Sequence, residues 1–310
     1  MQLLFDDELI ESVVFLCASG KSPGVASLQI RRFHAERERA YSVLDPDERN
    51  AAFSRIHRAW FREWGVEQCL LSALAEFPIL EKSVHAAAFR TARRKNEEGA
   101  ELYVNAAGER HAIVAVRSER FADRQSLLAF LRHELMHVSD MVAPAFGYSR
   151  EMGEAGQTAS QLRVVRERYR LLWDITIDGR LTRSNRCTVA AFEERRSEFD
   201  RAYGFLDAAK RSAVFDSHWN AVQPRHRDLI LLASDPRRLN ASNLPVPGAP
   251  CPLCDFATFE WAELRALKSE TANAIQKDFP GWTVEQGACF RCAEIYEAAR
   301  GLELPPTVCL

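Results

Sequence analysis

The sequence predicts a predominantly helical α+β protein with a small sheet, a metal-binding core and a small C-terminal unit that binds a second metal. Three observations indicate this: apolar residues recur at helical spacing over most of the chain, one pair of strand-like segments stands near residue 105, and two CxxC pairs follow residue 250. The predicted organisation is an N-terminal helical region 1–98, a core with its following helices 99–235, a linker 236–250 and a C-terminal unit 251–310.

The charge and the N-terminal segment exclude several classes of protein. The net charge of -2 predicts no strong attraction to nucleic acid or anionic lipid. The segment from Asp6 to Glu8 is acidic where a secretion signal would be basic, and no apolar run approaches the ~18 residues of a membrane span. We therefore expect a cytoplasmic protein without a membrane or nucleic-acid partner, whose cysteines are thiols or metal ligands rather than disulfides.

The N-terminal region is expected to be mostly helical. Asp45 and Pro46 have the chemistry of an N-cap followed by the first residue of a helix. Apolar residues then recur at helical spacing up to Trp64, and a second helix is predicted over 66–75, ending before Pro78.

A hairpin is predicted where the pattern changes. Residues 102–104 and 111–116 are strand-like, and Asn105 to Gly108 between them has turn chemistry. The second strand has two interpretations: an edge strand that pairs with an extended peptide substrate, or an ordinary strand packed on the next helix.

Three helices are expected after the hairpin. The first begins near Asp123, where apolar residues resume helical spacing, and the others cover about 160–182 and 189–215.

The helix that begins near Asp123 contains the motif His133-Glu134-Leu135-Met136-His137. Residues four apart share a helix face, so His133 and His137 can direct their imidazoles at one ion. Glu134 can then reach a water on that ion without being a ligand, and act as its general base. Three protein ligands leave an open position for this water, which is typical of a catalytic zinc site.

With this motif, residues 101–181 resemble the gluzincin branch of the zincin metallopeptidases. In that branch an edge strand precedes the HExxH helix, and a later helix supplies an acidic third ligand with a second acid four residues on. The resemblance implies that Asp174 is the third zinc ligand and that Asp178 orients a ligand histidine. The sequence departs from the pattern because the third ligand is Asp rather than Glu and its distance from His137 along the chain is long.

Other residues are candidates for the same roles. The alternatives for the third ligand are Asp178, Glu151 and Glu154, and Asp140 is expected to be an outer-shell or capping residue. Asp174 and Asp178 stand among apolar residues, where an acid needs a metal or a cationic partner, and Arg170 or Arg180 could be that partner. A hydrolase also needs a group that stabilises an oxyanion, and the candidates by residue type are Tyr148, His218 and His226.

The C-terminal unit contains two CxxC pairs, formed by Cys251, Cys254, Cys289 and Cys292. Four thiolates predict a closed, structural zinc site; redox exchange is the alternative. We expect a helix between the pairs, over 259–279, and another after the second pair, over 293–301. The arrangement resembles a zinc ribbon or treble clef. The remaining cysteines are expected to be inert thiols: Cys17, Cys69, Cys187 and Cys309.

The expected function is that of a zinc metallopeptidase with one catalytic and one structural zinc ion, acting on a peptide or protein substrate. The alternative is a zincin-fold binding or adaptor protein without turnover, whose C-terminal zinc unit docks a protein partner. The many acids around this unit, such as Asp255 and Glu294, disfavour nucleic acid as that partner.

Overall fold

A computed structural model describes residues 1–20, 24–149, 159–234, 247–262 and 269–302. The chain divides into two compact units. The first consists of Met1–Ser149, Asp174–Arg195 and His218–His226, and the second of the remaining segments. The described helices and strands agree with the predicted class, because helices predominate and the sheet is small.

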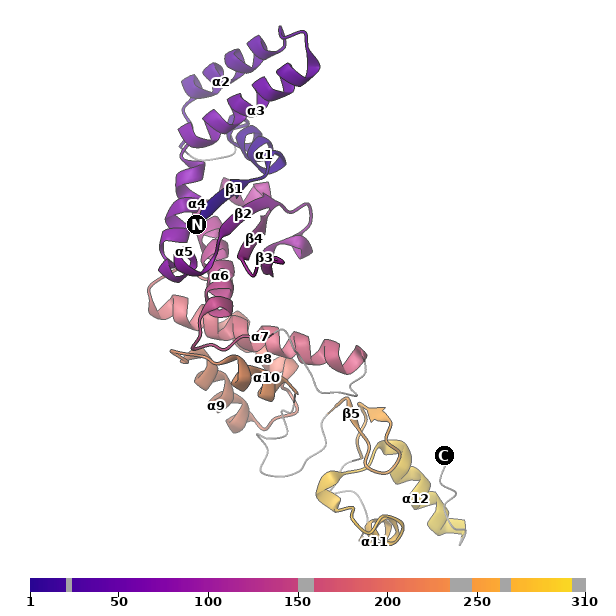
Figure 1. Cartoon of the computed structure of the whole chain (residues 1–310). Helices are drawn as coiled ribbons and strands as arrows, with labels where there is room; N and C mark the ends of the chain where they lie inside the picture. Colours follow the sequence, from indigo (N-terminus) through magenta and orange to yellow (C-terminus); the bar gives the residue numbers. More distant parts are fainter. Residues whose placement is uncertain (21–23, 150–158, 235–246, 263–268, 303–310) are drawn as a thin grey trace. The chain divides into compact units, whose positions relative to one another are not determined.

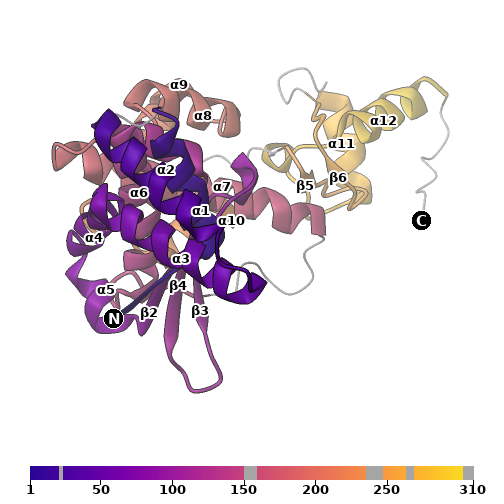
Figure 2. The same cartoon turned by 90° about the horizontal axis from the view of Figure 1, so that it is seen from above.

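A four-stranded mixed sheet is at the centre of the first unit (Figure 1). Its strands are β1 (Gln2–Phe5), β2 (Ala86–Thr91), β3 (Gly99–Val104) and β4 (Arg110–Val116), in the order β1-β2-β4-β3. β1, β2 and β4 are parallel, whereas β3 is antiparallel to β4. Seen from above, β3 and β4 run out together to their turn (Figure 2).

The predicted hairpin is confirmed, with one correction. The side-chain oxygen of Asn105 accepts hydrogen bonds from the backbone N–H groups of Ala107 and Glu109, and this closes the turn. However, β4 pairs with β2 on one side and β3 on the other. The interpretation of residues 111–116 as an edge strand is therefore wrong, and β3 lies at that edge of the sheet instead.

The segment before β3 is mostly helical as expected, but it also contributes two strands that were not predicted, β1 and β2. β2 begins Ala86-Ala87-Ala88, and alanine has the highest helix propensity of all residues. Ala86 and Ala87 are buried, and β2 pairs on both sides. Tertiary pairing thus overrides local preference here.

Five helices connect β1 to β2: α1 (Asp7–Ala18), α2 (Ser27–Ala40), α3 (Pro46–Glu63), α4 (Val66–Ala75) and α5 (Pro78–Ser83). The Asp45 cap is confirmed, since its carboxylate accepts a 2.8 Å hydrogen bond from the N–H of Glu48. The helix predicted over 66–75 is α4. α2 and α3 pack side by side as a helical hairpin (Figure 1).

The core of the first unit joins these helices to the sheet. Its side chains come from α1, α2, α3, α4, β2, β4 and the helix α6 (Arg124–Val142). Burying them removes apolar surface from water, which is the main favourable term in folding. Fully buried members include Leu9, Val13, Phe33, Leu70, Val114, Leu131 and Leu135.

The motif helix begins where predicted. Asp123 caps α6 by accepting a 2.9 Å hydrogen bond from the N–H of Gln125. The next predicted helix is α7 (Ala159–Arg183). The prediction of a single helix over 189–215 is wrong, because two helices cover this stretch: α8 (Phe192–Ala202) ends before Gly204, and α9 (Ala208–Trp219) begins after it. Asp207 caps α9, since its carboxylate accepts a hydrogen bond from the backbone N–H of Lys210. α10 (His226–Ser234) follows.

The cysteine-containing part of the second unit is small. It consists of β5 (Ala249–Pro250), β6 (Ala257–Thr258), α11 (Ser269–Asp278) and α12 (Phe290–Leu302). Residues 259–262 are not helical, since Trp261 bridges to Cys289, so the helix expected over 259–279 is shorter than predicted. Most of the predicted linker, residues 236–246, lies outside the described residues. No helix in the described part of the chain is long and apolar enough to cross a membrane.

Candidate metal centre

The two motif histidines lie one turn apart on α6, and both are buried. Their ring centroids are 5.0 Å apart and the rings are nearly perpendicular, at 73°. Leu131, Leu135 and Val138 on the same helix are fully buried in the core, which fixes the orientation of α6. The two imidazoles therefore have little freedom to turn away from each other.

Asp174 on α7 completes a three-residue group with these histidines. Its Oδ1 atom lies 3.0 Å from Nε2 of His137 and 3.4 Å from Nε2 of His133. Ligands about 2.0–2.1 Å from a tetrahedral zinc ion are separated from one another by about 3.3 Å. The three atoms thus have the spacing of ligands to one small cation.

Asp178 fixes the tautomer of His133. Its Oδ1 atom lies 2.9 Å from Nδ1 of His133, and Asp178 is fully buried. A carboxylate accepts only, so Nδ1 carries the proton and the lone pair of Nε2 points toward Oδ1 of Asp174. At this distance the space between Nε2 of His133 and Oδ1 of Asp174 needs a positive charge, either a proton on Nε2 or a metal ion. The group has the donor chemistry of a metal site with an outer-shell carboxylate.

Arg195, on α8, compensates the charge of the aspartate pair. Its Nε donates to Oδ2 of Asp178 at 2.7 Å, and its NH1 lies 3.6 Å from Oδ2 of Asp174. Arg195 is itself buried, so the ion pair is shielded from solvent. One of the two buried negative charges is thereby neutralised, and the other remains for a cation.

The pKa values of the group reflect the same electrostatics. Burial alone would lower the pKa of His133, yet the carboxylates of Asp174 and Asp178 outweigh it and raise that pKa to about 10. Burial alone would raise the pKa of Asp174, but its hydrogen bonds to the two histidines hold it well below the ordinary value. The local potential therefore strongly favours positive charge between these side chains.

Glu134, which follows His133 on α6, contacts the edge strand β3. Its Oε2 accepts a 2.8 Å hydrogen bond from the backbone N–H of Ala100 on β3. Gly99 precedes Ala100 with φ of +152°, a conformation that favours glycine, and a side-chain carbon there would lie 3.6 Å from the same oxygen. Strand β3 thus holds the predicted base of the motif in place.

None of the other acidic candidates is placed in the metal-ligand group by the described structure. Asp140 receives two hydrogen bonds from Arg180, at 2.8 and 2.6 Å, so it belongs to a structural ion pair. Arg180 is consequently not the partner of Asp174 or Asp178; Arg195 is. Sequence reasoning missed Arg195, because nothing in its local pattern distinguishes it from the adjacent Arg196. Glu151 and Glu154 lie outside the described residues.

Among the residues considered for an oxyanion, two pack against each other. The rings of Tyr148 and His226 are 5.4 Å apart and nearly perpendicular. Burial lowers the pKa of His226, which favours a neutral ring. His218 lies at the end of α9. None of these three side chains is assigned a role in the metal centre.

A second metal-ligand group lies in the C-terminal unit. The Sγ atoms of Cys251, Cys254, Cys289 and Cys292 all lie within 4.8 Å of one another, and no described cysteine is in a disulfide. Sulfur ligands about 2.3 Å from a tetrahedral zinc are about 3.8 Å apart, and Cys254 and Cys289 are separated by 3.9 Å. The group can hold a metal ion with thiolate ligands.

Backbone groups support the charge of these thiolates. The N–H of Cys289 donates to Sγ of Cys251 at 3.3 Å, and the N–H of Cys292 donates to Sγ of Cys289 at 3.4 Å. Of the other cysteines, Cys17 and Cys69 are buried in the core and Cys187 is exposed, whereas Cys309 lies outside the described residues.

Comparison with known proteins adds no relative: no family model, no curated protein and no solved structure matches this chain.

Proposed function

We propose that this protein is a zinc-dependent hydrolase that cleaves peptide bonds, with His133, His137 and Asp174 as the zinc ligands. The observation that carries the proposal is the convergence of Nε2 of both histidines on one oxygen of Asp174. Such a set of two imidazoles and a carboxylate, buried and with an outer-shell acid, is the donor set of catalytic zinc sites.

The resemblance to gluzincins agrees with this arrangement. An acidic residue on a later helix faces the motif histidines, and a second acid four residues on contacts His133. The shorter side chain of Asp174, relative to the Glu of that branch, is accommodated because α7 approaches α6 closely enough for a 3.0 Å contact.

The chain's own residues supply proton transfer. When bound at such ligands, zinc lowers the pKa of a coordinated water toward about 7 and polarises a carbonyl. Glu134 would take a proton from the water as its oxygen attacks the peptide carbonyl carbon. Glu134 would then pass that proton to the amide nitrogen as the C–N bond breaks.

The edge strand supports a peptide as the substrate. β3 has β4 on one side only, and its residue Ala100 contacts Glu134. An extended peptide that adds to the free edge of β3 as a further strand would therefore run past the proposed base.

The test compares wild-type protein with Glu134→Gln on a mixed peptide library, with zinc measured in both samples. We expect equal zinc content, because Glu134 is not a ligand, and loss of cleavage in the variant by about 10²–10⁴-fold. The matched control is Glu119→Gln, which removes an exposed acid on the neighbouring turn. Cleavage at the same rate by wild type and Glu134→Gln would exclude the mechanism.

A second candidate function is that of a binding protein whose C-terminal zinc unit docks a protein partner. It is favoured by three exposed aromatic side chains on that unit, Phe256, Phe259 and Phe290. If wild-type protein holds zinc at both sites and cleaves no peptide in the library, this candidate replaces the first.

A further inference from the structure

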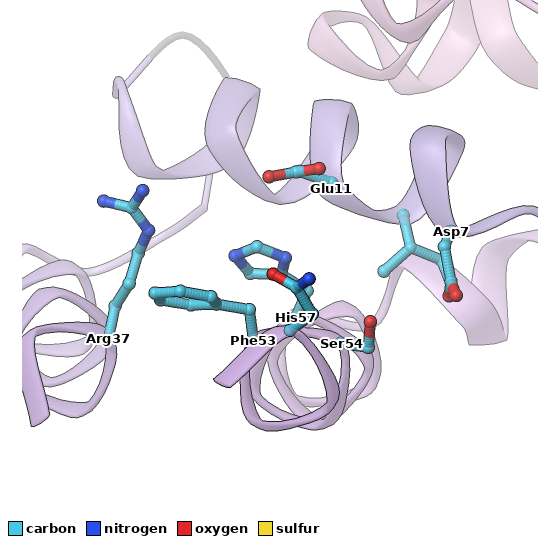
Figure 3. A pocket seen from close by; sticks show the side chains of 8 residues that line it. Asp7, Glu11, Arg37, Phe53, Ser54 and His57 are labelled. Carbon is cyan, nitrogen blue, oxygen red and sulfur yellow. The ribbon is translucent and has the colours of Figure 1, made fainter. Parts of the chain in front are cut away.

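A pocket of about 350 Å³ lies among α1, α2 and α3, in the first unit (Figure 3). Its volume is in the range of small-molecule sites. The face of α3 that lines it carries Asn50, Phe53, Ser54 and His57, at helical spacing i, i+3, i+4 and i+7. A face that only packed against neighbouring helices would be apolar at these positions. Three of the four side chains are polar instead.

His57 is the strongest indication that the pocket holds a ligand. It is 4% exposed, and its Nε2 atom is buried without a hydrogen-bond partner in the part of the chain that the structure describes. The ring is fixed by Phe15, edge-on at 5.4 Å, and by Phe53, stacked at 6.2 Å. Burial lowers the pKa of His57, so the ring is neutral and offers one donor and one acceptor. Leaving the buried Nε2 atom unsatisfied is costly, which indicates a polar molecule in the pocket.

Arg37 supplies a cation without an anionic partner. Its guanidinium lies over the rings of Phe15, Tyr41 and Phe53, at 4.9, 5.4 and 5.5 Å. In the part of the chain that the structure describes, no carboxylate pairs with it, and its Nε is buried without a hydrogen bond. The three rings hold the guanidinium rigidly, so it is preorganised to bind an anionic group.

Glu11 supplies the opposite charge. It lines the same pocket, and no cation within the described ranges forms an ion pair with it, whereas the nearby Asp7 is paired with Arg58 at 2.7 Å. Figure 3 shows Arg37 at one end of the pocket, Asp7 at the other and Glu11 on the wall above His57. Arg37 and Glu11 thus face the same space without pairing with each other.

We propose that this pocket binds a small zwitterion, with its carboxylate on Arg37 and its ammonium group on Glu11, as in a free amino acid or a very short peptide. The neutral ring of His57 and the side chains of Asn50 and Ser54 provide the remaining polar contacts. A simple anion would be repelled by Glu11, and a simple cation by Arg37, so only a molecule with both charges satisfies both walls. The proposal does not depend on the hydrolase function.

The test is calorimetric titration of the full chain with each of the twenty common amino acids and with glycylglycine. In parallel, the ring proton resonances of His57, assigned from their loss in His57→Gln, are followed by NMR. We expect saturable binding of at least one probe and a shift of the His57 resonances. Propionate and methylamine, each with one of the two charges, should bind at least about tenfold more weakly.

Two variants test the two charges separately. Glu11→Gln and Arg37→Met should each weaken binding by about tenfold or more. Glu11 is exposed, so Glu11→Gln is expected to leave the fold intact. Thermal unfolding tests whether Arg37→Met is still folded. The matched controls are Glu38→Gln and Arg39→Met, exposed side chains on α2 that do not line the pocket. Absence of binding by every probe at millimolar concentration, unchanged binding in Glu11→Gln, or propionate binding as tightly as the amino acid would each overturn the proposal.

Discussion

The carboxylate of Glu134 accepts a hydrogen bond of 2.8 Å from the backbone N–H of Ala100. This contact joins the motif helix to the edge strand across 34 residues of chain. Because the N–H of Ala100 donates to Glu134, it is not available for the ladder between β3 and β4. The position therefore allows the orientation of the base to be changed without removing a sheet hydrogen bond.

Replacing Ala100 by proline removes this donor alone. Proline is tolerated on edge strands where the lost N–H faces away from the neighbour. We expect Ala100→Pro to retain zinc and to lower kcat on a peptide cleaved by wild type about tenfold, the effect of one hydrogen bond to a charged group. Val104→Pro, at the exposed end of the same strand, is the control. Equal kcat in Ala100→Pro and wild type would show that the contact does not position the base.

The sequence predicted the local features of the site, whereas the long-range ones came only from the structure. The spacing of His133 and His137 and the caps at Asp45 and Asp123 follow from helix geometry, which operates within a few residues. The ion pair of Arg195 with Asp178 spans 17 residues and depends on how α8 packs. The strand β2 was hidden because its alanines favour a helix and only pairing with β1 and β4 makes it a strand.

The buried carboxylate of Asp178 is expected to tune zinc affinity without binding zinc. Asp178→Asn retains the shape of the side chain but removes its charge, so Nδ1–H of His133 loses a charged acceptor and Arg195 loses its partner. We expect zinc affinity, measured by competition with a chelator, to fall about 10–100-fold. Asp140→Asn breaks the ion pair with Arg180 and should leave zinc affinity unchanged. A similar loss in both variants would mean that general destabilisation, not the contact with His133, causes the effect.

Gly179 follows Asp178 directly and is expected to tolerate no side chain. A methyl group there would collide with the backbone carbonyl of Trp219, which cannot move as a flexible side chain would. Arg183 donates to the same carbonyl and, at 2.7 Å, to the carbonyl of Ala221, so this segment is held firmly against α7.

We therefore expect Gly179→Ala to destabilise the protein by about 1–3 kcal/mol, the usual cost of overpacking, although alanine has the higher helix propensity. Urea unfolding measures the difference. Gly281→Ala serves as the control, since a methyl group at Gly281 meets no atom within 4 Å. A stabilised Gly179→Ala would show that α7 and the Trp219 segment are not in contact in solution.

Glu98 should make stability depend on pH. Burial alone would raise its pKa, but hydrogen bonds from the Arg120 side chain and the Arg117 backbone outweigh this and lower the pKa below its ordinary value of 4.5. A lowered folded-state pKa means that Glu98 stabilises the fold above pH 4.5 and that the contribution is lost as the pH falls through the folded-state value.

Glu98→Gln removes this charge. We expect the variant to be less stable than wild type by on the order of 2 kcal/mol near neutral pH, with the difference shrinking as the pH falls below 4.5. Unfolding by urea at several pH values measures it, with the exposed Glu119→Gln as the reference. A difference between Glu98→Gln and wild type that stays constant from pH 7 to acid would contradict the assigned pKa.

The two metal groups should be separable, because they share no ligand and lie in different units of the chain. Wild-type protein is expected to hold two zinc ions per chain. Replacing Cys251 and Cys289 together by serine removes two thiolates from the C-terminal group, and the folding free energy contributed by that metal is lost with them. Limited proteolysis should then cut the C-terminal unit, while one zinc ion and any peptide cleavage remain.

Replacing His133 and His137 by alanine should have the opposite result: one zinc ion stays on the cysteines, and cleavage is abolished. The outcome to look for is the combination of zinc content and cleavage in each double variant. Two zinc ions retained after the cysteine substitutions would remove the thiolate site. Loss of both ions in the same variant would instead mean that the C-terminal metal is required for the first site to form, and the separation proposed here would be wrong.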